Sequence, residues 1–200
     1  HHVGSNNPDG IEIKQNKDKD GIPKDGIPFH PYFTIKDSVV VVGFLWIFCA
    51  VVFYAPALNG YFLEYPNFIE ANPLKTPEHI APLWYLTPYY SVLRAIPPLF
   101  GSQFPGVLGM FAALGVFFLL PWLDRSPVKS IRYRSPIYKW ILGTFVLSFI
   151  VLGWLGVQPV TPLYVLLARI FTILYFAFFI LMPWFSTLGK TKEVPERVTG

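Results

Sequence analysis

The stretch Val39–Ala57, VVVVGFLWIFCAVVFYAPA, carries no charged side chain and almost no polar one. It is the centre of an uncharged run of 26 residues between Asp37 and Glu64. At a rise of about 1.5 Å per residue, a helix of this length comes close to the ~30 Å thickness of the hydrocarbon layer of a membrane. The stretch therefore predicts a helix that crosses a lipid bilayer.

Three further stretches have the same character and decide the fold class with it. Their apolar cores are residues 106–123, 140–155 and 163–184. The core at 140–155 is short unless it extends to Ile137 or Val157, and the last one is interrupted by Arg169. We predict an all-α integral membrane protein with four transmembrane helices and a long Pro-rich interfacial loop between the first and the second. The predicted spans are residues 38–58, 105–123, 137–157 and 163–186.

The composition excludes the other broad classes. Of the 200 residues, 53% are hydrophobic and only 14% are charged, against roughly 25% charged residues in an average soluble domain. The charged residues are too few to cover a soluble globule, and disorder requires low hydrophobicity. The single cysteine, Cys49, excludes a disulfide framework, and we predict it to be a small buried apolar residue.

The basic residues predict the orientation. Of the 16 lysines and arginines, 13 lie before the first span, around the basic loop after the second span, or after the fourth. Positive residues favour the cytoplasmic side, so both termini are expected on the cytoplasmic or matrix side. The flanking segments are then the lead segment 1–37, the opposite-side loop 59–104, the basic loop 124–136 and the tail 187–200. Because the basic residues flank membrane spans, they do not indicate nucleic-acid binding.

The opposite-side loop 59–104 is rich in proline and in aromatic residues such as Trp84, Tyr85 and Tyr90. Its residues 85–96 predict a short helix, since Thr87-Pro88 is a suitable helix start. Two interpretations remain open for this loop. It is either a rigid lid held by proline and aromatic packing, or one wall of a pocket for an apolar ring ligand.

Few residues in the chain have side chains suited to metal binding, proton transfer or ligand contact. The four histidines are at positions 1, 2, 30 and 79, outside every predicted span, so the chain offers no pair to hold a haem, and we predict no metal ligand in it. Lys36 and Asp37 are either anchors at the membrane surface or part of a proton-exchanging pocket. For Arg169 three roles stay open: a structural partner, a side chain that reaches for the surface, or a ligand contact.

Two pairs of motifs resemble a known family. The residues Gly4–Pro8 and Ile27–Asp37 are similar to the cytochrome b signature that leads into its fifth transmembrane helix. The run Asn72–Tyr85, followed by Leu93-Arg94-Ala95-Ile96-Pro97, resembles the loop between the fifth and sixth helices of that family. The motifs occur in the family's order with one span between them. The whole chain therefore resembles the C-terminal half of cytochrome b, helices five to eight.

The resemblance implies part of quinol–cytochrome c reductase, complex III, in a bacterial or mitochondrial inner membrane. Ubiquinone and ubiquinol would be its substrates, and two haem b groups would have their axial ligands outside this chain. The implied partners are the N-terminal half of cytochrome b, a Rieske iron–sulfur protein and cytochrome c1, in a dimeric complex. The fragment alone is expected to be inactive. The rival hypotheses are a chain like subunit IV of plastoquinol–plastocyanin reductase, and a non-redox transporter or assembly subunit.

The resemblance also implies two sites, one near each membrane face. The quinone-reduction site would comprise His1, Ser5, Phe29, Lys36 and Asp37. The quinol-oxidation site would comprise Ile80, Pro82, Leu83, Trp84, Tyr85, Leu86 and Tyr90. At this second site the chain departs from the family, whose usual tetrapeptide is PEWY, because Leu83 replaces the glutamate and cannot accept a proton. The candidates for proton transfer are His1, Asp37, Glu78 and His79, and no residue is assigned as catalytic.

Overall fold

The computed structural model describes residues 7–11, 17–21, 24, 28–60, 62–63, 65–75 and 80–196. The chain divides into two compact units, one of residues 14–78 and one of residues 1–13 with 79–200. Among the described residues all regular structure is helical. Four helices are long and apolar enough to cross a membrane, at Tyr32–Tyr54, Phe104–Leu123, Pro136–Gly156 and Pro162–Phe185. The predicted all-α membrane fold with four spans is therefore confirmed.

The unit of residues 14–78 contains the long helix α1, Tyr32–Tyr54, and two short 3₁₀ turns, η1 (Leu58–Gly60) and η2 (Tyr65–Phe68). The predicted span began at residue 38, whereas α1 begins at Tyr32, because Phe33 N–H already bonds Phe29 O at 2.8 Å. The helix ends before Pro56, as expected for a residue that precedes proline.

No residue of α1 is buried within its unit, although the helix is apolar on every side. Cys49, which we predicted to be buried, is exposed for this reason. A helix that is apolar all round requires lipid or other protein around it.

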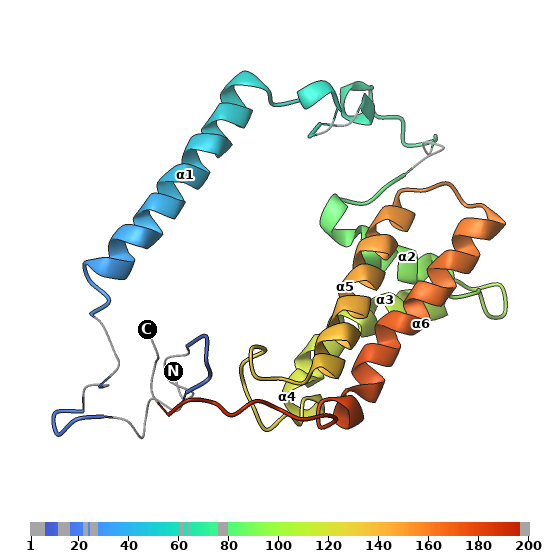
Figure 1. Cartoon of the computed structure of the whole chain (residues 1–200). Helices are drawn as coiled ribbons and strands as arrows, with labels where there is room; N and C mark the ends of the chain where they lie inside the picture. The colour runs from blue at the N-terminus through green and yellow to red at the C-terminus, as the bar shows by residue number, and fades with distance from the viewer. Residues whose placement is uncertain are drawn as a thin grey trace. The chain divides into compact units, whose positions relative to one another are not determined.

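The other unit is a bundle built on α2 (Thr87–Ala95), α3 (Phe104–Gly115), α5 (Pro136–Gly156) and α6 (Pro162–Phe185). The short helix α2, predicted over 85–96, follows the 3₁₀ turn η3 (Trp84–Leu86) and packs against α3, α5 and α6. The helices α5 and α6 run side by side (Figure 1) and are joined by the short segment 157–161. The short helix α2 is thus held on three sides.

Two of the long helices begin with the same local signal. Ser135 precedes Pro136, and Thr161 precedes Pro162. The Ser135 hydroxyl accepts the N–H of Tyr138 at 3.4 Å, and the Thr161 hydroxyl accepts that of Tyr164 at 3.3 Å. A hydroxyl at the cap and proline in the first turn are the preferred start of a helix, so these boundaries follow from the sequence.

The second span is not a single α-helix. It consists of α3, the 3₁₀ turn η4 (Val116–Leu119) and α4 (Leu120–Leu123). Pro121 has no N–H to continue the α-helical pattern, and its ring would clash with the carbonyl four residues earlier. The helix therefore tightens into the 3₁₀ turn η4 just before Pro121.

The core of the bundle is aromatic. Tyr175 and Phe179 are both 1% exposed, and the Phe145 ring stacks on Phe178 with their centroids 4.3 Å apart. The Tyr175 hydroxyl donates to Ala113 O at 2.7 Å, which satisfies its only polar group. Ring packing and satisfied hydroxyls are what holds helices together where lipid provides no hydrophobic driving force.

Candidate functional site

A row of large apolar side chains is exposed at the start of α2. We call Leu83, Trp84, Tyr85 and Leu86 the aromatic edge. Trp84 is 83% exposed and Leu83 62% exposed, and Tyr85 and Leu86 are exposed as well. The rings of Trp84 and Tyr85 meet edge to face at 5.6 Å between centroids. A contiguous exposed apolar patch on a rigid support is typical of a ligand or partner surface.

The backbone of the aromatic edge is fixed by its own hydrogen bonds. Leu83 is extended, and Leu86 N–H then donates to Leu83 O at 2.8 Å to close the turn η3. The Thr87 hydroxyl donates to Trp84 O at 2.7 Å. Pro88 follows in the first turn of α2, where its missing N–H costs nothing. The exposed rings are thus presented by an ordered backbone.

The aromatic edge rests on the end of α5. Thr87 and Pro88 are buried, and a Cβ built on Gly156 would lie 2.3 Å from Thr87 O. Only glycine allows that approach. On the next turn of α2, the Ser91 hydroxyl donates to Leu152 O at 2.5 Å.

Arg94 joins Tyr90 of the predicted oxidation site to α5. Its guanidinium lies 5.4 Å from the centre of the Tyr90 ring. Its two terminal nitrogens donate to Gln158 O at 3.0 and 3.1 Å, and one of them also reaches Gly156 O at 3.4 Å. These carbonyls lie at the C-terminal end of α5, where the helix dipole favours a cation.

The end of α2 is capped by two side chains from other elements. Arg169 Nε donates to Ala95 O at 3.0 Å, and Gln103 Nε2 donates to Leu93 O at 3.0 Å. Of the three roles left open for Arg169, the contact matches the structural partner, although the residue as a whole is exposed.

Tyr89 lies on the inner side of the same helix. Its ring meets Phe149 edge to face at 5.8 Å between centroids. Burial raises the pKa of the Tyr89 phenol above its ordinary value of 10.0. The group therefore stays protonated and remains a hydrogen-bond donor at every physiological pH.

The other predicted site falls in the unit with α1. Phe29, Phe33, Lys36 and Asp37 follow one another at helical spacing, so they share one stripe at the start of α1. The rings of Phe29 and Phe33 stack at 6.0 Å, and Lys36 Nζ lies 5.7 Å from the centre of the Phe33 ring. His30 Nδ1 and Thr34 Oγ1 are 3.3 Å apart. The stripe combines an apolar ring surface with a cation and a carboxylate.

The structure brings together only part of the predicted sites. Leu83–Leu86 and Tyr90 lie within three turns of chain, and Pro82 and the exposed Ile80 lead into them. His1, Ser5, Glu78 and His79 lie outside the described residues. The residues that support the edge, Thr87, Arg94 and Gly156, were not predicted. No local signal in the sequence links Gly156 to Thr87, because the two residues are 69 positions apart.

Comparison with known proteins decides the family. Residues 70–176 match the family model of the cytochrome b C-terminal domain, described as cytochrome b (C-terminal)/b6/petD. The chain belongs to the cytochrome b family. This membership excludes the transporter and assembly-subunit hypotheses.

Individual relatives agree with this assignment. Cytochrome b of Allochromatium vinosum is 63% identical over 203 residues, which cover 100% of this chain and 49% of that protein. Cytochrome b of Rickettsia bellii is 43% identical and is matched over 46% of its length. A chain of a hyperthermophilic respiratory complex III superposes with a TM-score of 0.78 at 43% identity, over 92% of this chain and 44% of that one. The chain spans about half the length of these cytochrome b relatives and corresponds to their C-terminal half.

The family implies haem b, and the described residues do not fit a haem ligand set. Haem in such proteins needs axial side chains such as a pair of histidines facing each other inside the bundle. His30 is exposed and precedes α1, and the described residues contain no cluster of three His, Cys, Asp or Glu side chains.

Proposed function

We propose that this chain, as the C-terminal half of cytochrome b, supplies one wall of a quinol-oxidation site and part of a quinone-reduction site in a quinol–cytochrome c reductase. The observation that carries the proposal is the aromatic edge. A large apolar surface is exposed just before α2, and its backbone is held by the hydrogen bond from Leu86 N–H, by that from the Thr87 hydroxyl, and by the close contact of Thr87 with Gly156. An apolar ring with polar oxygens at its rim matches such a surface.

At the oxidation site, the chain's own residues bind and orient the quinol. Leu83, Trp84 and Leu86 cover the ring and exclude water, and the hydroxyls of Tyr85 and Tyr90 are available to hold a ring oxygen. Leu83 accepts no proton. The quinol proton must therefore pass to another group, for which Glu78 and His79 are the nearest candidates along the chain.

At the reduction site, Phe29 would pack on the quinone ring. Reduction of a quinone to a quinol consumes two protons, and a carboxylate and an imidazole beside the two carbonyls can deliver them. Asp37 and His1 are our candidates for these roles, with Ser5 and Lys36 as further hydrogen-bond donors. The stripe of Phe29, Lys36 and Asp37 at the start of α1 supports the proposal.

The basic residues support an orientation with both termini on the cytoplasmic or matrix side. We assign the partners from the family: the N-terminal half of cytochrome b, a Rieske iron–sulfur protein and cytochrome c1, in a dimeric complex. The haem ligands would come from the N-terminal half. Ubiquinone is the assigned quinone.

A photoreactive ubiquinone analogue tests the proposal directly. The membrane complex that contains this chain is illuminated with the analogue, and the labelled peptides are identified by mass spectrometry. We expect label in two peptides, one with Ile80–Tyr90 and one with Phe29–Asp37, and excess ubiquinone should remove it from both. Label confined to other spans, or label that ubiquinone does not displace, would overturn the proposal.

A further inference from the structure

The membrane helix α6 carries a single charged residue, Arg169, and this residue is exposed. Leu166, Ile170 and Ile173 are exposed too, and their spacing along the helix places them on one face with Arg169. We call these four residues the α6 stripe. The other side of α6 packs against α2 and α5, where Ala168 is buried. An apolar face that a membrane helix leaves exposed is stable against lipid.

Arg169 lies close to one surface of the membrane. It follows Pro162, the first residue of α6, by seven positions, or about 10 Å at helical rise. Trp154 and Tyr164 lie near the same end of the bundle, with their ring centroids 5.6 Å apart, and such rings favour the membrane–water interface. Side chains lean toward the N-terminus of their helix, so the Arg169 side chain leans toward this interface. Its guanidinium is therefore within reach of lipid headgroups.

The guanidinium of Arg169 is held at one nitrogen and open at the other two. Its Nε donates to Ala95 O at 3.0 Å, and Ala95 is buried at the end of α2, so the group is fixed on a rigid support. Among the described residues, no acceptor bonds Nη1 or Nη2 of Arg169, and no carboxylate pairs with it. A cation at the edge of the hydrocarbon layer is unfavourable without a counter-charge.

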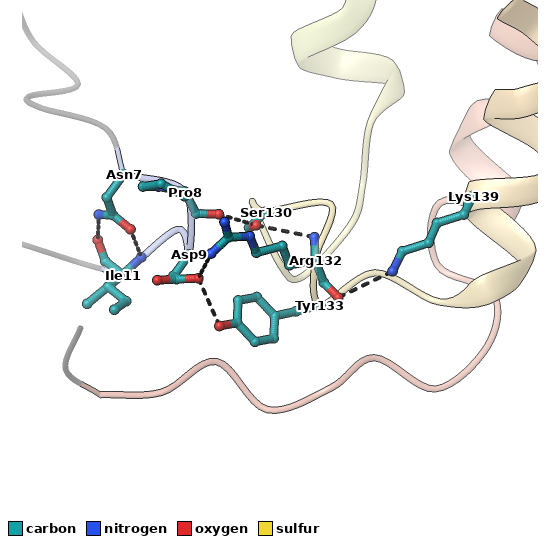
Figure 2. A network of polar contacts seen from close by, with 8 residues as sticks. All are labelled: Asn7, Pro8, Asp9, Ile11, Ser130, Arg132, Tyr133 and Lys139. Atoms are coloured by element: carbon teal, nitrogen blue, oxygen red, sulfur yellow. Dashed lines mark hydrogen bonds and ion pairs between the residues drawn. The ribbon is translucent and has the colours of Figure 1, made fainter. Parts of the chain in front are cut away.

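Two arginines at the other end of the bundle are neutralised by the chain itself. Arg132 Nη1 and the Tyr133 hydroxyl both donate to Asp9 Oδ1, each at 3.0 Å (Figure 2). The Asp9 side chain is only 11% exposed, and a carboxylate this well covered needs such donors. Arg134 forms an ion pair with Asp124 at 2.7 Å. These two pairs need no anion from outside, whereas the α6 stripe contains no carboxylate.

We propose that Arg169 binds the phosphate group of an anionic phospholipid, whose acyl chains lie along Leu166, Ile170 and Ile173. The two terminal nitrogens form a planar fork that matches two phosphate oxygens. Because Ala95 O already fixes the guanidinium, little side-chain freedom is lost on binding. A lipid with net negative charge, such as phosphatidylglycerol, neutralises the cation, whereas the phosphate of phosphatidylcholine is already paired with its own ammonium. This role does not require the proposed quinone sites.

Photoreactive phospholipids test the proposal on the membrane complex. The complex is reconstituted in phosphatidylcholine vesicles that contain either a phosphatidylglycerol or a phosphatidylcholine probe, with the reactive group on the acyl chain. Mass spectrometry then measures the label in the peptide with Leu166–Ile173. We expect this peptide to prefer the phosphatidylglycerol probe about fivefold, the usual effect of one basic residue beside anionic lipid.

Three variants assign the preference to the guanidinium. Arg169→Gln keeps an amide that can donate to Ala95 O but removes the charge, and it should abolish the preference. Arg169→Lys keeps the charge but not the fork, so its preference should be smaller than that of the unmodified complex. Arg125→Gln makes the same charge change at an exposed arginine at the other end of the bundle, and it should leave the preference of the α6 peptide unchanged.

Several outcomes would overturn the proposal. A preference that is absent from the unmodified complex, or that persists in Arg169→Gln, excludes a lipid held by this group. An equal loss of label from both probes in Arg169→Gln leaves Arg169 only a structural role. If neither probe labels the peptide, protein covers the α6 stripe. If added inorganic phosphate removes the preference, the site takes free phosphate instead. If Arg169→Gln fails to assemble, Arg169→Lys decides, and a preference equal to the native one excludes the forked contact.

Discussion

Gly156 and Thr87 are in such close contact that a Cβ on the glycine would lie 2.3 Å from the threonine carbonyl oxygen. This contact fixes the position of the first turn of α2 against the C-terminal end of α5. It thereby also fixes the position of the aromatic edge, which directly precedes that turn. The contact involves backbone on both sides, so a side-chain rotation cannot relieve a clash there.

Gly156→Ala is therefore expected to destabilise the bundle by about 1–3 kcal/mol, the usual cost of overpacking. Thermal unfolding of the purified complex is the measurement, with labelling of the Ile80–Tyr90 peptide as a second readout. Gly143→Ala lies in the same helix, where a Cβ meets nothing within 4 Å, and should leave the unfolding temperature unchanged or slightly raised. Equal behaviour of the two variants would contradict the role of the contact.

Arg94→Ala should lower quinol turnover roughly tenfold, because hydrogen bonds from a charged donor are worth about 1.5–3 kcal/mol and this group is half-buried. Steady-state turnover with ubiquinol and cytochrome c gives the measurement. Arg94→Lys keeps the cation near the end of α5 but loses the forked contact to Gln158 O, so it should recover only part of the activity. Arg125→Ala is the control, and full activity in Arg94→Ala would exclude the assigned role.

Leu83→Glu tests whether another group accepts the quinol proton in this chain, where Leu83 replaces the glutamate of the family's PEWY tetrapeptide. If another group already accepts the quinol proton, the substitution should change turnover by no more than about twofold. General-base catalysis is worth on the order of 10²-fold or more. A gain of that size in Leu83→Glu would mean that the native complex lacks a compensating acceptor. Leu83→Gln, which has the same length but no basic carboxylate, separates proton transfer from shape.

Tyr133 provides a prediction for alkaline pH. Burial first, and then the hydrogen bond and charge of Asp9, raise the pKa of its phenol above 10.0, against an opposing effect of Arg132. The neutral phenol is the form that donates to Asp9. Its contribution is therefore complete below pH 10 and is lost as the pH rises through the raised pKa.

The phenolate absorbance of the native complex minus that of Tyr133→Phe isolates this titration. We expect its midpoint above pH 10, and Asp9→Ala should move it back toward 10. A midpoint at or below 10 in the native complex would show that Asp9 does not hold the phenol.

The membrane-spanning helices could be predicted from the sequence, but the contacts between them could not. Long apolar runs, of which only the last contains a charged residue (Arg169), predicted all four long helices, and Thr87-Pro88 predicted α2, because these signals are local. The support of the aromatic edge by Gly156 was missed, since it joins residues 69 positions apart and a glycine alone predicts no partner. The prediction for Cys49 was wrong because apolar character does not distinguish burial in protein from exposure to lipid.

The functional residues, too, include some that the sequence predicted and some contacts that only the structure shows. The resemblance to cytochrome b predicted the oxidation-site residues in Pro82–Tyr90, and their role stays a prediction; Trp84–Leu86 form the turn η3, and Tyr90 lies on α2. The docking of Asp9 on Arg132 and Tyr133 had no signal in the sequence, because the partners are more than 120 residues apart. Such pairs are visible only once the chain is folded.

The 3₁₀ turn η4 in the second span changes how far twenty residues reach. A 3₁₀ helix rises about 2.0 Å per residue against 1.5 Å in an α-helix, so the four residues Val116–Leu119 add roughly 2 Å to the length of Phe104–Leu123. The 20 residues of this segment thereby span roughly 32 Å, against about 30 Å for a regular α-helix of the same length, which is enough to cross the ~30 Å hydrocarbon layer. Replacement of Pro121 by alanine would allow a regular α-helix over the same residues, and the segment would then be roughly 2 Å shorter.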